Sequence, residues 1–251
     1  MYVPFDVAKK VSDMGADKTS QQAVRVILAA ILAGVYIGLG YYTNIESIHL
    51  FQGNPIGRVV GSLLFPTGLL LVLFTGAQLF TGNCLLTLGY LENRYPMIAV
   101  LRNWAIVYIG NFIGSIFIAF LIKHTGLMEG SRLATLEALI EPKISMTFIE
   151  AFSRGFLCNV LVAIAVYVSF ASKSAIGQIA SLWFPVSLFV LAGFEHSVAN
   201  MFILPLGYMS GIELTIKEIW MNNLLPVTFG NMAGGGLFIP LFYYRIFLHG
   251  K

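Results

Sequence analysis

Six long apolar segments decide what this chain can fold into, because a helix that crosses about 30 Å of hydrocarbon needs roughly 20 mostly apolar residues. The chain is 57% hydrophobic and 11% charged, with a mean hydropathy of +0.81, whereas soluble domains carry about 25% charged residues. The sequence therefore predicts an all-α membrane protein with six transmembrane helices. The expected spans are Val24–Tyr42, Val59–Tyr90, Met97–Ile122, Phe148–Ala171, Ile176–Gly207 and Leu224–Leu248.

The second and fifth spans are too long for one plain helix, and each contains glycine and polar residues in its middle. The chain also repeats two patterns, Gly110-Asn111-x-x-Gly114 as Gly230-Asn231-x-x-Gly234, and Gly76-x-Gln78-x-x-x-x-Asn83 as Gly193-x-Glu195-x-x-x-x-Asn200. A repeat of three helices gives two halves of opposite topology, and such inverted repeats place a substrate path where their interrupted helices meet. We expect a single transmembrane channel domain over residues 1–251, with repeats at roughly 24–122 and 148–248 and with interrupted second and fifth helices.

Lys and Arg residues outside the spans favour one side of the membrane. Nine of them fall on the side that would hold both termini and five on the other, which predicts cytoplasmic termini in a multi-pass plasma or inner membrane protein. The first 22 residues lack the apolar core of a signal peptide, so we expect them to be retained.

The segment Lys123–Thr147 is charged enough to predict an aqueous loop. The net charge of +3, with no dense basic run, gives no reason to expect a nucleic-acid partner.

Polar residues at membrane depth are costly and therefore face the protein interior or water. Glu195 and His196 lie together in the interrupted part of the fifth span, near Asn200, and Thr81 lies in the matching part of the second. Glu195 is either a structural acceptor, a subunit contact or part of a transport path. For His196 a functional role is favoured, because a histidine in a polar break at this depth is rarely only packing.

For the other candidate residues, a purely structural role is an alternative to a functional one. Thr81 is a hydroxyl of a pore or a helix cap, and Asn159 is structural or pore-lining. Lys143 alone is an ordinary loop lysine, and Phe65 and Phe189 alone are core or lipid-facing residues. The stripes of small residues predict close helix packing. Cys84 and Cys158 are expected to be small core residues, and no metal or cofactor is expected.

Three stretches resemble signatures of the formate/nitrite transporter family, and the resemblance runs from the first span to the last. Gly193-Phe194-Glu195-His196-Ser197-Val198-Ala199-Asn200-Met201 is the most specific of them. The others are Leu73-Phe74-Thr75-Gly76-Ala77-Gln78-Leu79-Phe80-Thr81-Gly82 and Gly155-Phe156-Leu157-Cys158-Asn159-Val160-Leu161-Val162. One departure is that Gln78 stands where an acidic residue is usual in the family.

The resemblance implies an aquaporin-like inverted-repeat subunit in a homopentamer, with one pore in each subunit. His196 would be the pore histidine, Thr81 would lie in the interrupting loop, and Asn159 would approach from the fourth span. Lys143 would be the lysine of the outer vestibule. Two apolar constrictions are implied: Leu79 with Val162 on the cytoplasmic side, and Phe65 with Phe189 on the outer side.

The leading hypothesis is a pore for small monovalent anions, such as formate, nitrite or hydrosulfide, or for their conjugate acids. An anion drawn in by Lys143 would take up a proton near His196 and cross in neutral form, or it would pass as an anion paired to a cationic His196. The alternative is a pore for neutral solutes, although the paired Asn-Pro-Ala signature of aquaporins is absent. An intramembrane enzyme using His196 and Glu195 is disfavoured, because no metal-ligand spacing or nucleophile–base pair is present. The stretches Ala33–Gly40 and Phe80–Asn83 look closer to nitrite and hydrosulfide members of the family.

Overall fold

A computed structural model describes residues 1–250, and within that range every regular element is a helix. The first half contains α1 (Pro4–Ser20), α2 (Ala23–Leu50), α3 (Pro55–Leu64), α4 (Pro66–Thr75), α5 (Phe80–Asn83), η1 (Cys84–Leu86), α6 (Thr87–Leu91) and α7 (Met97–His124). The second half contains α8 (Ser131–Ile144), α9 (Phe148–Ser169), α10 (Ala175–Leu191), α11 (Ser197–Met209), α12 (Ile216–Glu218), η2 (Ile219–Leu224), α13 (Leu225–Asn231), η3 (Met232–Phe238), α14 (Ile239–Tyr243) and η4 (Tyr244–Leu248).

Five helices are long and apolar enough to cross a membrane. They are Ala23–Leu50, Pro55–Thr75, Met97–His124, Phe148–Ser169 and Ile216–Leu248. The predicted fifth span is divided into the shorter apolar helices α10 and α11. The expected count of six spanning helices therefore stays a prediction, whereas the interruption of the second and fifth spans is confirmed.

Two segments differ from the prediction in where a helix begins or in what the segment contains. The last long helix begins at Ile216 rather than Leu224, because Thr215 and Glu218 form a reciprocal capping box that starts it among polar residues. The predicted aqueous loop Lys123–Thr147 contains the helix α8. Hydropathy alone missed α8 because its sequence is mixed in polarity.

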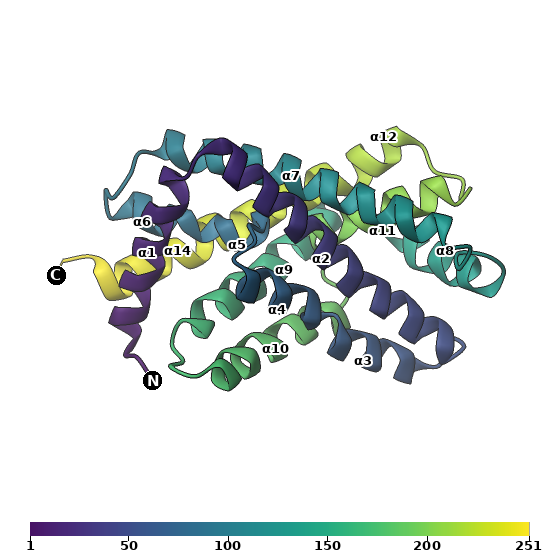
Figure 1. The fold of residues 1–251 in the computed structure, drawn as a ribbon, viewed down its shortest axis with the longest axis horizontal. Helices are drawn as coiled ribbons and strands as arrows, with labels where there is room; N and C mark the ends of the chain where they lie inside the picture. The colour runs from purple at the N-terminus through teal and green to yellow at the C-terminus, as the bar shows by residue number, and fades with distance from the viewer. Residues whose placement is uncertain (251) are drawn as a thin grey trace.

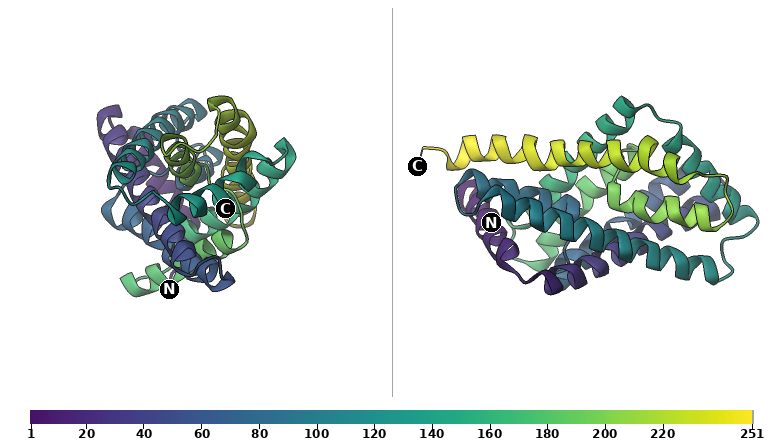
Figure 2. Two further views of the ribbon diagram at one scale, coloured as in Figure 1. Left: turned by 90° about the vertical axis from the view of Figure 1, so that its right-hand side faces the viewer. Right: turned by 90° about the horizontal axis from the view of Figure 1, so that it is seen from above.

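Both termini lie at one end of the helix bundle, near α1, α6 and α14, and α3, α8 and α12 lie at the opposite end (Figure 1). The last long helix runs along the whole bundle from one end to the other (Figure 2). We call the first end the terminal end and the second the α8 end. The placement of both termini together agrees with the predicted topology, in which they share a side.

The small-residue stripes bring helix backbones into contact, as predicted. A Cβ added at Gly114 of α7 would lie 2.0 Å from the Ile31 carbonyl oxygen of α2. A Cβ added at Gly234 would lie 2.2 Å from the Phe156 carbonyl oxygen of α9. The two halves therefore pack their first and third long helices in the same way.

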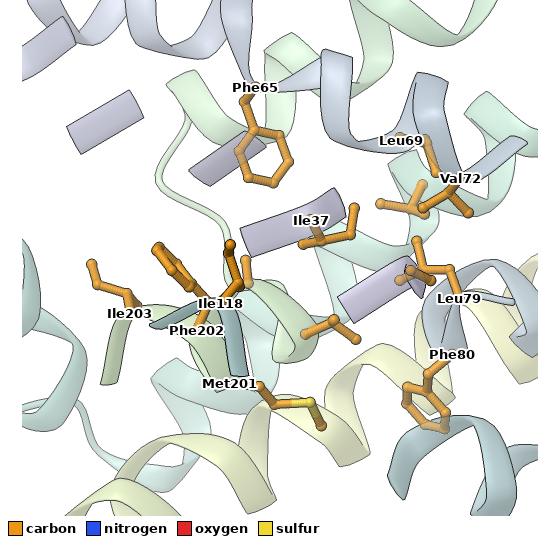
Figure 3. Packing of buried hydrophobic residues seen from close by; sticks show 14 of the residues in the cluster. Ile37, Phe65, Leu69, Val72, Leu79, Phe80, Ile118, Met201, Phe202 and Ile203 are labelled. Carbon is orange, nitrogen blue, oxygen red and sulfur yellow. The ribbon is translucent and has the colours of Figure 1, made fainter. Parts of the chain in front are cut away.

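Apolar side chains from both halves form the main core. In the view of Figure 3, Ile37 of α2 projects between Phe65 and Leu79. Cys84 and Cys158 are free and fully buried, in agreement with the prediction. This packing surrounds the two helix breaks, which place the polar residues described next.

Candidate functional site

Two breaks of the same design interrupt the second and fifth spans. Helix α4 ends at Thr75 and is followed by Gly76 at φ +73°, and α5 begins at Phe80. Helix α10 ends at Leu191 and is followed by Gly193 at φ +72°, before α11 begins at Ser197. Glycine reaches this left-handed conformation without the steric cost that other residues pay. The repeated glycines of the sequence therefore mark where the helices stop.

A buried asparagine closes each break with its side chain. Asn111 accepts a hydrogen bond from the Phe80 amide at 2.9 Å and donates to the Gln78 carbonyl oxygen at 2.9 Å. Asn231 accepts from the Ser197 amide at 2.9 Å and donates to the Glu195 carbonyl oxygen at 3.0 Å. Backbone groups freed by a break need such partners when no water is available. The sequence pattern contained both asparagines, but it indicated only helix packing for them.

His196 is the N-cap of α11, and its hydrogen bonds determine its tautomer. Its Nδ1 atom accepts a hydrogen bond from the Ala199 amide at 3.1 Å. A backbone amide only donates, so Nδ1 carries no proton and the neutral ring holds its proton on Nε2. The Nε2 atom lies 2.8 Å from Thr81 Oγ1, which therefore accepts from the ring. The hydroxyl hydrogen of Thr81 remains available to another acceptor.

Aromatic rings cover His196 toward the α8 end. The Phe189 ring stacks on the imidazole, with centroids 5.8 Å apart and planes inclined by 15°. The Phe65 ring meets Phe189 edge-on, with centroids 5.6 Å apart. These rings and His196 border a cavity of about 200 Å³ that also reaches Lys143, Glu195 and Asn200. The two phenylalanines predicted to form one constriction thus lie together beside the histidine.

Lys143 and Glu195 form a buried ion pair at this cavity. The Lys143 ammonium lies 2.8 and 2.9 Å from the two carboxylate oxygens of Glu195 and also donates to Asn200 Oδ1 at 3.1 Å. Asn200 donates to the carboxylate at 2.6 Å, and Asn223 donates to it at 3.3 Å. The Glu195 carboxylate therefore accepts hydrogen bonds from a lysine of α8 and from two asparagine side chains, rather than from the freed backbone groups considered from the sequence.

The charge of Lys143 is secured by this pair. Burial by itself would lower the pKa of the ammonium, but the Glu195 carboxylate, together with Tyr41, raises the pKa above its ordinary value. The ammonium also lies 5.8 Å from the centre of the Tyr41 ring. Lys143 is only 9% exposed, so it is not the ordinary loop lysine that its sequence context suggested.

The remaining candidates lie deeper in the protein than the cavity lining. Leu79 precedes α5 and Val162 lies in α9, and both belong to the buried core. Asn159 donates to the Asn231 carbonyl oxygen at 2.7 Å, and its own Oδ1 has no partner. Thr81 is fully buried. The structure thus joins Thr81 to His196 directly, and it ties Asn159 to the asparagine that closes the second break.

Sequence reasoning missed Asn223, Tyr41 and the helix that carries Lys143. A signal for Asn223 existed, because Asn103 and Asn223 are separated by the same 120 positions as Asn111 and Asn231. No comparable signal existed for Tyr41, which lies in an apolar span among other aromatic residues.

The formate/nitrite transporter family model matches residues 5–245 of this chain. A probable formate transporter of Methanothermobacter thermautotrophicus is 38% identical, over 98% of this chain and 97% of the relative. The formate channel FocA of Escherichia coli K12 is 31% identical, over 99% of this chain and 95% of the relative.

Two solved structures share the fold. A pentameric formate channel with formate bound superposes with a TM-score of 0.80 at 32% identity, covering 90% of this chain and 98% of that one. A channel described as an FNT family ion channel superposes with a TM-score of 0.89 at 26% identity, covering 96% of this chain and 98% of that one. The motifs, the paired helix breaks and these matches agree, and the chain belongs to the formate/nitrite transporter family.

Proposed function

We propose that this protein carries small monovalent anions, with formate as the first candidate, across the plasma or inner membrane in which its subunits assemble as a homopentamer. Each subunit would hold one path, which passes Lys143 and Asn200, the rings of Phe65 and Phe189, His196 with Thr81, and Leu79 with Val162. Glu195 would line this path beside Lys143, and Asn159 would hold Asn231, the asparagine that closes the second break. The observation that carries the proposal is the Thr81–His196 hydrogen bond beside a cavity bounded by a buried lysine.

The physical problem for an anion on this path is desolvation. A bare anion loses most of its hydration between the phenylalanine rings, and apolar surroundings penalise its charged form heavily. A weak acid avoids this cost when its anion takes up a proton, because the neutral form loses little hydration free energy in apolar surroundings. The free hydroxyl hydrogen of Thr81 is then the donor placed to receive the substrate beyond the rings.

Formate leads because several relatives are described as formate channels or transporters and a structural neighbour was solved with formate bound. Nitrite and hydrosulfide share its single charge and small size, and they remain candidate substrates. A pore for neutral solutes is the second candidate. It is favoured by only one feature, the neutral tautomer of His196.

The test is solute uptake in liposomes that contain the purified protein. Stopped-flow traces for formate, nitrite, hydrosulfide, acetate and glycerol are compared at equal concentration gradients. We expect formate to equilibrate fastest, acetate slowly, and glycerol no faster than in protein-free liposomes. Rapid glycerol uptake with no acceleration of the anions would contradict the proposal.

The pentamer is tested separately, by native mass spectrometry of the protein released from detergent. Five copies of the 27.5 kDa chain are expected in one complex. A dominant monomer that still transports formate in liposomes would reject the assembly and keep the substrate assignment.

A further inference from the structure

Two polar residues of α2 line the cavity beside His196, and the proposed path does not use them. Tyr41 and Asn44 lie three positions apart, so they share one face of the helix, and both border the cavity of about 200 Å³. Tyr41 is half-buried and Asn44 is 5% exposed. We call these two residues the α2 donors, because each carries a hydrogen-bond donor that can meet a solute entering the cavity from the α8 end.

The lysine at the same cavity has no hydrogen bond left for such a solute. An ammonium has three donors, and those of Lys143 are directed at the two carboxylate oxygens of Glu195 and at Asn200 Oδ1. The carboxylate of Glu195 also balances the charge of the lysine. An anion that arrives here must therefore find its hydrogen bonds elsewhere.

The hydroxyl hydrogen of Tyr41 is free. The hydroxyl faces the Lys143 ammonium, which donates and does not accept, so this contact uses the oxygen and leaves the hydrogen. The Tyr41 ring packs on Phe65 and Phe202, and among residues 1–250 no acceptor for the hydrogen lies within hydrogen-bonding distance. The side-chain amide of Asn44 likewise has no hydrogen-bond partner in this part of the chain. Both donors are thus available to a ligand in the cavity.

Aromatic packing fixes the Tyr41 hydroxyl at the entrance to the phenylalanine rings. The Tyr41 ring meets Phe65 edge-on, with centroids 5.8 Å apart and planes inclined by 86°, and it lies 6.3 Å from the Phe202 ring. Phe65 in turn contacts Phe189. On the proposed path, a solute that passes from Tyr41 to Thr81 therefore crosses these rings between two hydroxyl groups that each have a hydrogen to donate.

The charge that draws an anion to this cavity lies at its rim. Arg58 and Arg154 border the cavity and are exposed. Neither takes part in the ion pairs found among residues 1–250. Positive charge around a cleft raises the local concentration of anions, and the α2 donors lie inside that cleft.

We propose that the α2 donors form an oxyanion-binding site on the α8-end side of the phenylalanine rings, and that this site favours formate and nitrite over hydrosulfide. The inference rests on the proposed function and deepens it, because it names the class of anion that the path accepts.

Hydrogen bonding separates these anions where charge does not. Formate and nitrite each present two oxygens that share the negative charge, and hydrogen bonds to such oxygens are short and roughly twice as strong as those between neutral groups. Hydrosulfide offers only a sulfur atom, which is a weak acceptor. All three anions carry one charge, so the arginines at the rim attract them alike. The α2 donors replace the lost water of an oxyanion more fully, which lowers its cost of reaching the rings.

The first experiment measures binding directly, by infrared difference spectroscopy of the full-length protein in nanodiscs with ¹³C-labelled tyrosine rings. The carbon–oxygen stretch of a tyrosine shifts when its hydroxyl donates a hydrogen bond, and the Tyr41 band is assigned by its loss in Tyr41→Phe. Sodium formate and sodium nitrite are the probes, with sodium chloride as the control for ionic strength. We expect a saturable shift of the Tyr41 band with both oxyanions, a much smaller one with hydrosulfide, and none with chloride.

The second experiment measures competition in membrane vesicles whose α8 end faces outward, selected because a C-terminal tag is protected from protease. Uptake of trace labelled formate is followed while external nitrite or hydrosulfide is raised, at a mildly alkaline pH that keeps hydrosulfide ionised. In Tyr41→Phe the nitrite concentration for half-inhibition should rise about tenfold, as the loss of one hydrogen bond to a charged group implies. The hydrosulfide concentration should stay nearly unchanged. A variant that only disturbed the packing would change both concentrations alike.

Two further variants complete the comparison. Tyr36→Phe is the matched control, because it removes the same hydroxyl from α2 at a half-buried position that does not border the cavity, and it should keep both wild-type concentrations. Asn44→Ala should act in the same direction as Tyr41→Phe, with nitrite weakened and hydrosulfide unchanged. Equal changes for nitrite and hydrosulfide in Tyr41→Phe, or a Tyr41 band that ignores formate, would overturn the inference.

The two proposals fail in different ways. A formate-dependent Tyr41 band in a protein that transports no anion would reject the proposed function and keep the oxyanion site. Formate uptake with the same nitrite-to-hydrosulfide ratio in wild type and Tyr41→Phe, and with no shift of the Tyr41 band, would reject the site and keep the function.

Discussion

The imidazole of His196 is fixed by two hydrogen bonds of opposite direction. Its Nδ1 accepts from the Ala199 amide and its Nε2 donates to Thr81 Oγ1. A proton on Nδ1 would bring two donors, Nδ1–H and the Ala199 amide, face to face, and the ring would no longer cap α11. Losing such an N-cap costs about 1 kcal/mol. The geometry thus favours the neutral ring in this conformation. The proton exchange at His196 that we expected from the sequence would require the ring to leave its cap.

This argument predicts the pH dependence of transport in His196→Asn. Asparagine is among the best N-cap residues, so this variant keeps an acceptor for the Ala199 amide but has no titratable ring. We expect initial formate uptake in liposomes to persist, and its profile between about pH 5 and 7 to keep the wild-type shape. A flattened profile would show that the ring itself titrates during transport.

His196→Phe serves as the control for this comparison, because it keeps a ring of similar size and removes both hydrogen bonds. Uptake should fall at least tenfold at every pH in a protein that still assembles. Wild-type rates in this variant would remove His196 from the path altogether.

Among the elements, the positions of the two helix breaks could be predicted from the sequence. The side chains that hold the breaks in place could be predicted only in part. Gly76 and Gly193 with their repeated polar residues predicted where the spans stop, because few residues tolerate that backbone conformation. The Lys143–Glu195 pair joins residues 52 positions apart. Nothing in the local sequence of a mixed-polarity helix indicates that its lysine turns inward. The burial of Lys143 depends on how α8 packs against the other helices, and the hydrophobic periodicity of the sequence does not indicate that packing.

The asparagine that closes each break should matter for stability. Asn231→Ala leaves the Ser197 amide and the Glu195 carbonyl oxygen without their partner, and a buried group left unsatisfied costs about 1–3 kcal/mol. We expect a lower melting temperature of the detergent-solubilised protein and reduced uptake. Asn222→Ala on the same helix removes one partly buried hydrogen bond, to the Ile144 carbonyl oxygen, and should have a much smaller effect. Equal melting temperatures for the two variants would contradict this account.

The ion pair between α8 and the second break predicts strong coupling between its two residues. Lys143→Gln leaves the Glu195 carboxylate buried without its cation, and breaking a buried pair in this way costs about 3–5 kcal/mol. Lys143→Gln with Glu195→Gln removes both charges and should recover most of the stability. Thermal melts of the wild type, both single variants and the double variant give the coupling energy. Additive effects of the two substitutions would mean that the pair is not formed in the membrane.

In the whole molecule, apolar side chains cover the outer surface and polar side chains lie in the interior, the reverse of a soluble protein. Large apolar side chains are exposed on most of the long helices, among them Leu28, Ile109, Phe117, Phe184 and Phe238. Lipid and neighbouring subunits of the proposed pentamer are the surroundings that suit such a surface. The polar groups are instead collected inside, where the two halves meet, and this division explains why hydropathy predicted the class of protein and not its path.

The closest aromatic contact between the two halves beside His196 is that of Phe65 with Phe189, one ring from each half. Both rings are almost fully buried, at 2% and 3% exposure, so the proposed path is closed at this level.

If these rings select substrates by size and by refusing to solvate charge, then Phe65→Ala with Phe189→Ala should raise the uptake of acetate and butyrate relative to formate by about tenfold or more. Each single variant should give a smaller increase, because the remaining ring still covers part of the opening. Phe184→Ala, at an exposed position of α10, is the matched control and should keep wild-type ratios. Uptake ratios measured by stopped flow that stay unchanged in the double variant would place the selective constriction elsewhere, with Leu79 and Val162 as the next pair to replace.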